Sequence, residues 1–401
     1  VLEGLRLNLG NGKRGKLLRS ATHSAIWWIV DENAHKDIDA IVPDKPCLKD
    51  VIVGEIQGAV LVYVDDLLVI AGLTVTTQVM EALRQVWTLA DPTTLGANGV
   101  QSIKFLGVVL EIPDEELHTD KAPQRLTLHQ TLYAEEVLTK YSEALRTRTS
   151  TGELEQRISA HAVLTPTQAP ERHKKLQQIA GALLWLATRT RPDLAWGTSV
   201  LASTMSRDVR EAETRAKHLL QYLATTRDQG LRYEAMPEGL LTRWDLYTDV
   251  SFAPTGNKSH EASVLFLGRP GVNAVAWTSS KQKLTTLSSC EAELCAAISG
   301  VGMMMSLGHL LEEAAQQAIS KRLGVDNLPS IQQLRHGQMA PLRTRHISIR
   351  GARLAEMMET GELLVDHVTT TEQPADALTK ALSGLAFEHA RTRLGLVLVG
   401  P

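Results

Sequence analysis

The sequence predicts a multidomain protein of the α+β or α/β class, in which a strand-rich first part, a helical middle part and a mixed-sheet last part follow one another. Three observations support this. The chain has 401 residues, more than one hydrophobic core usually serves. Residues 172–223 carry apolar side chains at helical spacing. After residue 243, short β-rich runs alternate with helical segments, as in an α/β domain with a mixed sheet.

In the first part, residues 60–72 read "VLVYVDDLLVIAG" and place Asp65 beside Asp66 in an apolar run. Burying one unpaired carboxylate costs several kcal/mol and two repel each other, so a fold accepts such a pair where a turn exposes it or a cation neutralises it. We expect two strands joined by a tight turn at Val64-Asp65-Asp66, with the carboxylates at the hairpin tip. A helix is expected over residues 75–87 because their apolar side chains recur at helical spacing.

The first part ends with a strand pair around Gly107, in "QSIKFLGVVLEI", and the middle part follows it. "LTLHQTLYAEEVLTKY", residues 126–141, is expected to be helical. Residues 142–171 are rich in Thr, Ser and Pro and are expected to form a linker. Two helices broken near Arg191-Pro192 and a third over residues 209–226 follow, and Gly230 is expected to end this block.

The last part opens with three expected strands, "RWDLYTDVSFA", "ASVLFLG" and "NAVAWTSS". A long helix follows from Ser288, which reads as a serine cap followed by Glu. Then come a short strand into Asp326, a helix, another helix from about Ile347 and the strand "ELLVDHV". A last helix is expected to open at Pro374, because Pro suits the first position of a helix.

The amino-acid composition limits the classes of function that the protein can have. The net charge of −3 argues against a strongly basic nucleic-acid binder, but does not exclude an enzyme that binds phosphates locally and carries acidic metal ligands elsewhere. Only 4% of residues are aromatic, so few can stack on bases. Three cysteines without a CxxC pair suggest neither a disulfide framework nor a zinc site, and fit a reducing compartment. No apolar run reaches the roughly 18 residues of a membrane span.

The N-terminus is not a secretory signal, because its apolar residues are interspersed with charge. It also lacks an initiator Met, so we expect a fragment or a processed product.

Four acids of the last part stand at predicted strand ends and helix starts: Asp249, Glu293, Asp326 and Asp376. Such positions on one side of a sheet gather side chains, and gathered acids need cations. Paired Mg²⁺ ions about 3.5–4 Å apart suit phosphodiester chemistry. Each acid also has a structural alternative. Asp376 suits a helix N-terminus and Asp326 suits an N-cap or turn. Glu293 reads equally well as a solvated residue, and Glu291 is as good a candidate by pattern alone.

Several blocks resemble copia-type retrotransposon Pol polyproteins. "YVDD" between apolar strands resembles the catalytic turn of reverse transcriptases. "LLWLATRTRPDLAWGTSVLASTMS" and "AKHLLQYLATTRDQGLRY" are similar to the connecting region of these polyproteins. "YTDVSFA", "AWTSSKQKLTTLSSCEAELCAAISG", "VDN", "RTRHISIR" and "EQPADALTKAL" resemble the ribonuclease H domain. The blocks follow the family's order from about Leu61 to Leu382, and their joint occurrence makes the match specific.

The resemblance implies a role for each acid. Asp65 and Asp66 match the paired acids that hold Mg²⁺ (or Mn²⁺) for nucleotidyl transfer, and "FLGVVLEI" resembles the segment that supports the primer end. The four ribonuclease H ligands are matched by Asp249, Glu293, Asp326 and Asp376. In each site one metal ion would activate the attacking oxygen and the other would stabilise the leaving oxygen.

The chain departs from the family mainly before the hairpin. Reverse transcriptases need a further metal-binding Asp on an earlier palm strand. Asp31 is the only candidate for this role, and the sequence around it does not match the family. Residues 2–28 are a degraded version of the expected "YGL" and "W" landmarks. In the nuclease, Cys290 stands where the family has Thr and Ser348 where it has Asp. A decayed genomic copy would show this mixture.

Basic residues of the last part have two interpretations. Lys281 and Lys283 lie between the third strand and the long helix, where they would steady the backbone of a hybrid. Arg345, with Arg343 and Arg350, is expected to contact phosphates or to form a solvated face. His346 matches a family His, but reads more readily as a structural histidine. The run Met303-Met304-Met305 is expected in a helix core.

The resulting hypothesis is a Pol fragment with a partial reverse-transcriptase palm (1–112), a mostly helical thumb/connection region (113–240) and a ribonuclease H-like domain (241–401). Its expected activity is metal-dependent cleavage of RNA in RNA–DNA hybrids, with the polymerase module inactive alone. The implied partners are a hybrid, an RNA template with a DNA primer, and other Pol-derived subunits, but no membrane. The implied location is intracellular, in cytoplasmic virus-like particles, in the nucleus or in both.

Two other hypotheses remain open. The first is a decayed or domesticated copy that binds nucleic acid without catalysis, against which the four intact acids argue. The second is another nuclease of ribonuclease-H-like fold, such as a resolvase or an integrase, against which the upstream "YVDD" block argues.

Overall fold

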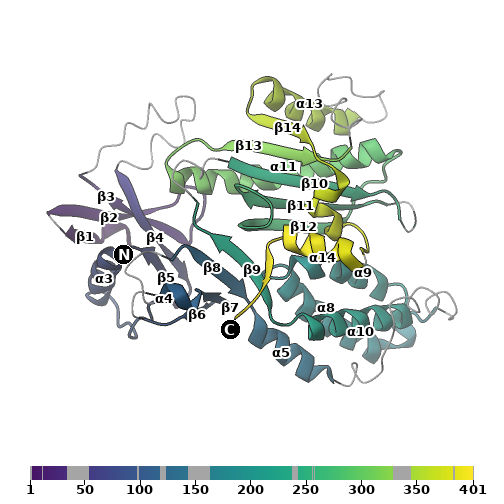
Figure 1. Cartoon of the computed structure of the whole chain (residues 1–401), viewed down its shortest axis with the longest axis horizontal. Coiled ribbons are helices and arrows are strands. Elements are labelled where there is room, and N and C mark those ends of the chain that lie inside the picture. The colour runs from purple at the N-terminus through teal and green to yellow at the C-terminus, as the bar shows by residue number, and fades with distance from the viewer. Residues whose placement is uncertain are drawn as a thin grey trace.

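Three five-stranded sheets organise the described part of the chain in the computed structural model (Figure 1). The structure describes residues 2–10, 12–33, 54–96, 99–117, 123–142, 163–236, 243–254, 256, 258–327, 345–382 and 384–400. The short elements among them are η1 (Leu2–Gly4), α4 (Asp114–Leu117), η2 (Pro166–Gln168), η3 (Pro192–Leu194) and η5 (Thr370–Glu372).

The N-terminal sheet is antiparallel and follows chain order. Its strands are β1 (Arg6–Gly10), β2 (Lys13–Arg19), β3 (Ile26–Asp31), β4 (Glu55–Tyr63) and β5 (Asp66–Ala71). Helix α3 (Leu73–Arg84) covers one face, where Leu83 packs into a core with Leu17 and Ile29. The predicted hairpin is therefore present, followed by the predicted helix, although the helix begins at Leu73 rather than Val75.

The second sheet brings distant parts of the chain together in the antiparallel order β15-β9-β8-β7-β6. Its strands are β6 (Ser102–Phe105), β7 (Val108–Glu111), β8 (Arg125–His129), β9 (Gln229–Glu234) and β15 (Leu396–Leu398). The sheet therefore includes strands from all three parts of the chain that the sequence suggested, and its last strand lies close to the C-terminus.

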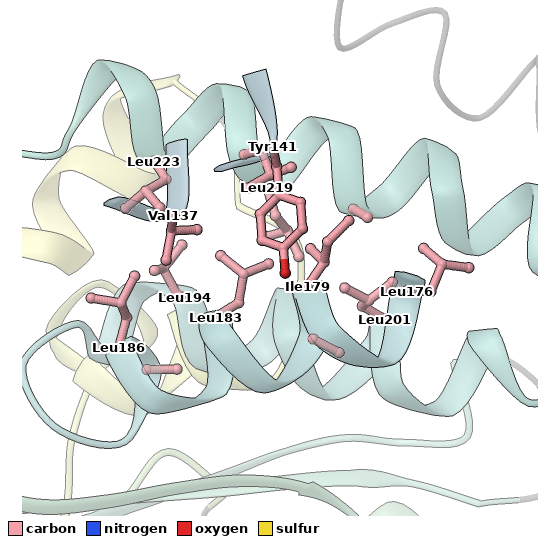
Figure 2. Close-up of a cluster of buried hydrophobic side chains, with 14 of the residues drawn as sticks. Val137, Tyr141, Leu176, Ile179, Leu183, Leu186, Leu194, Leu201, Leu219 and Leu223 are labelled. Carbon is pink, nitrogen blue, oxygen red and sulfur yellow. The ribbon is translucent and has the colours of Figure 1, made fainter. Parts of the chain in front are cut away.

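A bundle of four helices stands beside this sheet: α5 (Thr131–Lys140), α8 (Pro170–Ala187), α9 (Ala195–Met205) and α10 (Val209–Thr225). Figure 2 shows their shared core, in which Tyr141 points between Leu183 and Ile179. The predicted break between the first two long helices is present. Arg191 lies in this break and is buried. Its guanidinium pairs with Asp193 at 2.7 Å and also donates to the backbone oxygen of Thr226.

The third sheet is mixed, with order β12-β11-β10-β13-β14. Strands β10 (Arg243–Ser251), β11 (His260–Leu267) and β12 (Ala274–Lys281) are antiparallel, whereas β13 (Ser320–Val325) and β14 (Leu363–His367) run parallel to β10. Helices α11 (Ser289–Ala315) and α13 (Arg345–Glu359) pack on one face. The 3-10 helix η6 (Pro374–Leu378) and α14 (Gly384–Arg393) pack on the other. This is the mixed α/β sheet that the sequence predicted.

Helix α11 also joins the third sheet to the first. Leu310 and Ala314 near its end pack against Trp28 and Val30 on the face of the N-terminal sheet opposite α3. Glu313 accepts hydrogen bonds there from Ser20 and Trp28. By length and composition α11 would suit a membrane crossing, but it packs against β10 and β11 as a core helix. The N-terminal sheet is thus sandwiched between its own helix and the long helix of the last part.

Three details of the predicted secondary structure were wrong. Residues 126–129 form strand β8, because Leu126 and Leu128 alternate with polar residues and pair with β7 and β9. Gly230 lies inside β9, where a Cβ atom would come within 2.7 Å of the Leu128 oxygen, so it permits close strand approach rather than ending a block.

The third error concerns residues 374–382, which contain the 3-10 helix η6 instead of an α-helix. Tertiary contacts decide this segment, because all five residues of η6 are buried and the preceding Gln373 side chain donates to the Thr248 oxygen. The last α-helix is α14, and α13 begins two residues before the expected Ile347. The helix expected directly after Asp326 and most of the expected linker lie outside the described residues.

Candidate metal centre

Three of the predicted acids meet at one end of the third sheet. Asp249 lies near the end of β10 and Asp326 directly follows β13. These strands are parallel and pair Tyr247 with Gly324, so both acids lie two residues beyond that pair. Glu293 comes from the start of α11. One carboxylate oxygen from each acid lies within 4.8 Å of the others. The arrangement suits one hard cation with oxygen ligands.

The surroundings of these acids favour a bound cation. Asp249 and Glu293 are buried and Asp326 is half-buried. Burial, together with the negative charges of Asp249 and Asp326, raises the pKa of Glu293 to about 9. Burial and Asp249 also raise the pKa of Asp326. Glu293 Oε2 is buried without a hydrogen-bond partner among the described residues. A buried, unpartnered carboxylate oxygen facing two more acids is the donor set that Mg²⁺ or Mn²⁺ would satisfy.

The fourth predicted acid, Asp376, lies beside this trio and is paired differently. Its Oδ1 is 2.8 Å from the ammonium of Lys380, which also lies 3.9 Å from Asp249 Oδ2. Burial and the nearby Asp249 raise the pKa of Asp376 to about 7. Asp376 opens no α-helix, contrary to expectation, but projects from η6 onto the same end of the sheet. The structure therefore brings three acids together, with the fourth held next to them by a lysine.

Two residues of this site were missed by the sequence reasoning. The Thr379 hydroxyl donates to Asp249 Oδ2 and so fixes that carboxylate. Lys380 pairs with two of the acids, and these negative charges raise its pKa against the opposing effect of burial. The spacing of four residues between Asp376 and Lys380 was the only signal in the sequence, and it is equally typical of a surface ion pair.

The structure distinguishes Glu293 from Glu291. Ser288 caps α11 by accepting from the Glu291 backbone N–H, and the Glu291 carboxylate accepts from Leu287 N–H at 2.7 Å. The predicted serine cap is present, but the Glu291 carboxylate accepts from the residue before the cap instead of from the Ser288 N–H, and so it is occupied at the start of the helix. Glu293, two residues later, points to the other acids.

The predicted nucleic-acid-binding residues are only partly described. Lys281 ends β12 and Lys283 follows the strand, and both are exposed. Lys258 donates to the Lys283 oxygen and adds a third ammonium to this loop, which the sequence reasoning did not single out. The side chains of Arg345 and His346 lie outside the described residues.

The second predicted site, at the hairpin, is arranged differently. Asp65 lies in the turn between β4 and β5 and Asp66 opens β5, and both are exposed. Val64 in the turn has a positive φ of 53°. Within the part of the chain that the structure describes, neither carboxylate forms an ion pair and neither meets a third acid.

Asp31 does not supply the missing third acid. It is buried at the far end of β3, where it pairs with Glu55 at the start of β4 and lies 2.9 Å from the Lys13 ammonium. Asp65 follows the opposite end of β4. At about 3.3 Å per residue, the eight steps from Glu55 to Tyr63 separate the two ends by roughly 26 Å. Asp31 and the hairpin acids therefore cannot share a metal ion.

Comparison with curated proteins finds similarity to retrotransposon Pol polyproteins. The chain is 27% identical over 299 residues to the Retrovirus-related Pol polyprotein from transposon TNT 1-94 of Nicotiana tabacum, covering 73% of this chain and 22% of the relative. It is 28% identical over 345 residues to that from transposon RE2 of Arabidopsis thaliana, covering 85% and 22%. A Transposon Ty1-NL2 Gag-Pol polyprotein of Saccharomyces cerevisiae is 24% identical over 226 residues, covering 54% and 12%.

These relatives are much longer than this chain, which spans about a fifth of the first two. No family model matches the sequence. The similarity nevertheless confirms the resemblance to retrotransposon Pol polyproteins that the motifs indicated.

Solved structures with some likeness include RNase H1 from Halobacterium salinarum NRC-1, with 21% identity, 34% of this chain and 93% of that chain covered, and a TM-score of 0.25. LC11-RNase H1 in complex with RNA/DNA hybrid has 15% identity, coverage of 32% and 88%, and a TM-score of 0.25. TM-scores this low carry no weight, so the fold rests on its own strand order.

Proposed function

Because the chain is similar in sequence to retrotransposon Pol polyproteins, we propose that it is a piece of a copia-type Pol polyprotein whose last part is a metal-dependent ribonuclease acting on RNA–DNA hybrids. One observation carries the proposal: three acids from β10, α11 and the end of β13 converge within 4.8 Å on a mixed sheet. The same acids are those that the resemblance matched to ribonuclease H ligands.

We propose that Asp249, Glu293 and Asp326 hold the divalent cation. When bound, the cation would supply activation of a water and stabilisation of the leaving oxygen of a phosphodiester. The protein contributes fixed geometry. Thr379 holds the Asp249 carboxylate by a hydrogen bond, and burial of Glu293 keeps bulk water from competing for its unpartnered oxygen. The exposed ammonium groups of Lys281 and Lys283 are proposed to contact the phosphates of the hybrid, together with Arg345.

We further propose that the hairpin acids do not support DNA synthesis in this chain. Two adjacent exposed carboxylates hold a divalent cation weakly, and Asp31 lies at the wrong end of its strand to assist. Loss of one ligand misplaces the attacking oxygen, and about 1 Å of misplacement costs on the order of 100-fold in rate.

The test uses the whole chain with a labelled RNA–DNA hybrid, in the presence of Mg²⁺ and after its removal by a chelator. We expect cleavage of the RNA strand that requires Mg²⁺ and is lost in Asp249→Asn, which keeps the side-chain shape and removes the charge. Cleavage that persists unchanged in this variant would overturn the nuclease proposal.

A primer and nucleotides added to the same reaction test the polymerase proposal separately. No extension is expected, and extension by the unmodified chain would overturn that part alone.

A further inference from the structure

Lys380 lies against two acids of the cluster. Its ammonium is 2.8 Å from Asp376 Oδ1 and 3.9 Å from Asp249 Oδ2. The Lys380 side chain is 38% exposed, whereas those of Asp249 and Asp376 are almost fully buried. The ammonium therefore bridges two buried carboxylates from the solvent side.

This bridge divides the four acids into two groups. Asp249, Glu293 and Asp326 have oxygens mutually within 4.8 Å, and Asp376 is not part of that group. Lys380 already places its positive charge against one oxygen of Asp249 and one of Asp376, the two carboxylates that a second cation would need. A divalent cation and an ammonium cannot share these oxygens, because they compete for the same lone pairs and repel each other.

We propose that Lys380 is a positioning residue that serves as a built-in cation between Asp249 and Asp376, so that a second divalent cation binds only when the lysine leaves. The inference rests on the proposed metal centre and adds the order in which two cations would bind to it. The first cation binds at the trio of acids, and the second position stays closed until Lys380 swings toward solvent. The released ammonium would then face the side from which a phosphate backbone arrives.

The geometry allows this movement. Within the described residues, the ion pairs of Lys380 are made at the tip of its long side chain, and its exposure leaves room for other rotamers. Asp376, by contrast, is fixed in η6, where its backbone oxygen accepts from the Thr379 and Lys380 N–H groups. Removing the ammonium therefore leaves the two carboxylates in place and opens the second position.

The experiment measures Mn²⁺ binding to the whole chain, by calorimetry and by the paramagnetic resonance of free Mn²⁺. For the unmodified chain we expect one tight site and a second at least about 10-fold weaker, since an ion pair must be broken first. Lys380→Gln should tighten the second site about 10-fold or more, and Lys380→Arg should leave it weak. The double variant Lys380→Gln with Asp376→Asn should lose the second site again.

The outcomes separate the two proposals. Equal affinities in the unmodified chain and in Lys380→Gln would overturn the role of Lys380 while leaving the metal centre intact. Loss of the first site in Lys380→Gln would also overturn it, because the lysine would then be part of the scaffold. Lys380→Met, a second neutral variant, must behave as Lys380→Gln does, so that a folding defect in one is recognised. Absence of any Mn²⁺ binding by the unmodified chain would overturn the metal centre itself.

Discussion

The two acidic sites of this chain both place carboxylates at the ends of strands, yet they are built in opposite ways. At the metal centre, residues 249, 293 and 326 come from three elements, and two of the three acids are buried. At the hairpin, two neighbouring residues share one exposed turn. Of these two sites, the hairpin has its acids closer together in the sequence, but among the described residues the acids converge in space at the metal centre. Convergence and burial, rather than adjacency, produce a site that needs a cation.

The electrostatic consequences differ accordingly. Burial and mutual repulsion raise the pKa values of Glu293 and Asp376 to about 9 and about 7. The exposed hairpin acids are screened by water, so they repel each other weakly without any cation. The metal-free cluster of acids on the third sheet is therefore under electrostatic stress that the hairpin does not share.

The largest expected difference between the two sites is in how hybrid cleavage responds when their negative charges are removed. Glu293→Gln removes a proposed metal ligand, so we expect hybrid cleavage to fall by about 100-fold or more. The double variant Asp65→Asn with Asp66→Asn should cleave as the unmodified chain does, because the hairpin takes no part in hydrolysis. The measurement is the initial rate of RNA-strand cleavage in Mg²⁺.

Glu291→Gln is the matched control for this comparison. It lies two residues from Glu293 on the same helix, and Gln can still accept from the Leu287 N–H. Equal losses in Glu291→Gln and Glu293→Gln would show that the helix start, not the metal ligand, had been damaged. A strong loss in the hairpin variant would mean that the two sites are coupled.

The next effect concerns pH. Because the folded-state pKa of Glu293 is raised from 4.5 to about 9, the folded chain binds more protons than the unfolded chain between these values. Stability is therefore lost as pH rises through this window. Buried histidines also titrate below pH 7 and change the stability there. The interval in which the effect of Glu293 can be measured is therefore about pH 7 to 9. There we expect the melting temperature of the metal-free chain to fall by several degrees and Mg²⁺ to restore it.

Glu293→Gln should remove most of this dependence, whereas the hairpin double variant should keep it. The measurement is thermal unfolding with a chelator and with Mg²⁺. A metal-free melting temperature that rises over the same interval would contradict the assignment of a raised pKa to Glu293.

A smaller effect is expected where the two regions touch. Glu313 of α11 is buried and accepts from the Ser20 hydroxyl at 2.6 Å and from the Trp28 indole N–H at 3.0 Å. Glu313→Ala would leave these donors buried and unsatisfied, at a cost of about 1–3 kcal/mol. Urea unfolding followed by tryptophan fluorescence measures this cost. The control is Glu356→Ala, whose exposed ion pair with Arg353 should matter little.

The sequence allowed the order of most elements and the identity of the three converging acids to be predicted, because strand and helix periodicity is local. Other features have no local signal. The contact of Glu313 with residues 20 and 28 joins positions almost 300 residues apart, so no pattern in either segment indicates it. Likewise, Asp31 was a reasonable candidate by residue type, and only strand register shows that it lies at the wrong end of β3.

The environment of Asp376 was unpredictable for a related reason. Pro374 and an acid two residues later are typical of a helix start, yet tertiary burial and the Gln373 side chain hold the segment as a 3-10 helix. In that conformation Thr379 and Lys380 both reach Asp249. Local propensity predicted a helical turn here, but it could not predict which side chains of this turn would contact the acids of the site.

The smallest effect compares two glutamates of α11 by stability alone, and their signs should be opposite. Glu291 accepts from the Leu287 N–H, so Glu291→Ala removes a hydrogen bond at the helix start and should lower the free energy of unfolding by about 0.5–1 kcal/mol. At about pH 8 the raised pKa of Glu293 means that the folded metal-free chain keeps a proton on this group that the unfolded chain releases; Glu293→Gln removes this cost, so the metal-free variant should unfold at higher urea than the unmodified chain. Adding Mg²⁺ should reverse the order, because only the unmodified chain keeps the ligand. If Glu293→Gln destabilised the metal-free chain as Glu291→Ala does, the carboxylate of Glu293 would be a structural partner of its neighbours, and the contrast between a stressed metal centre and an unstressed hairpin would not hold.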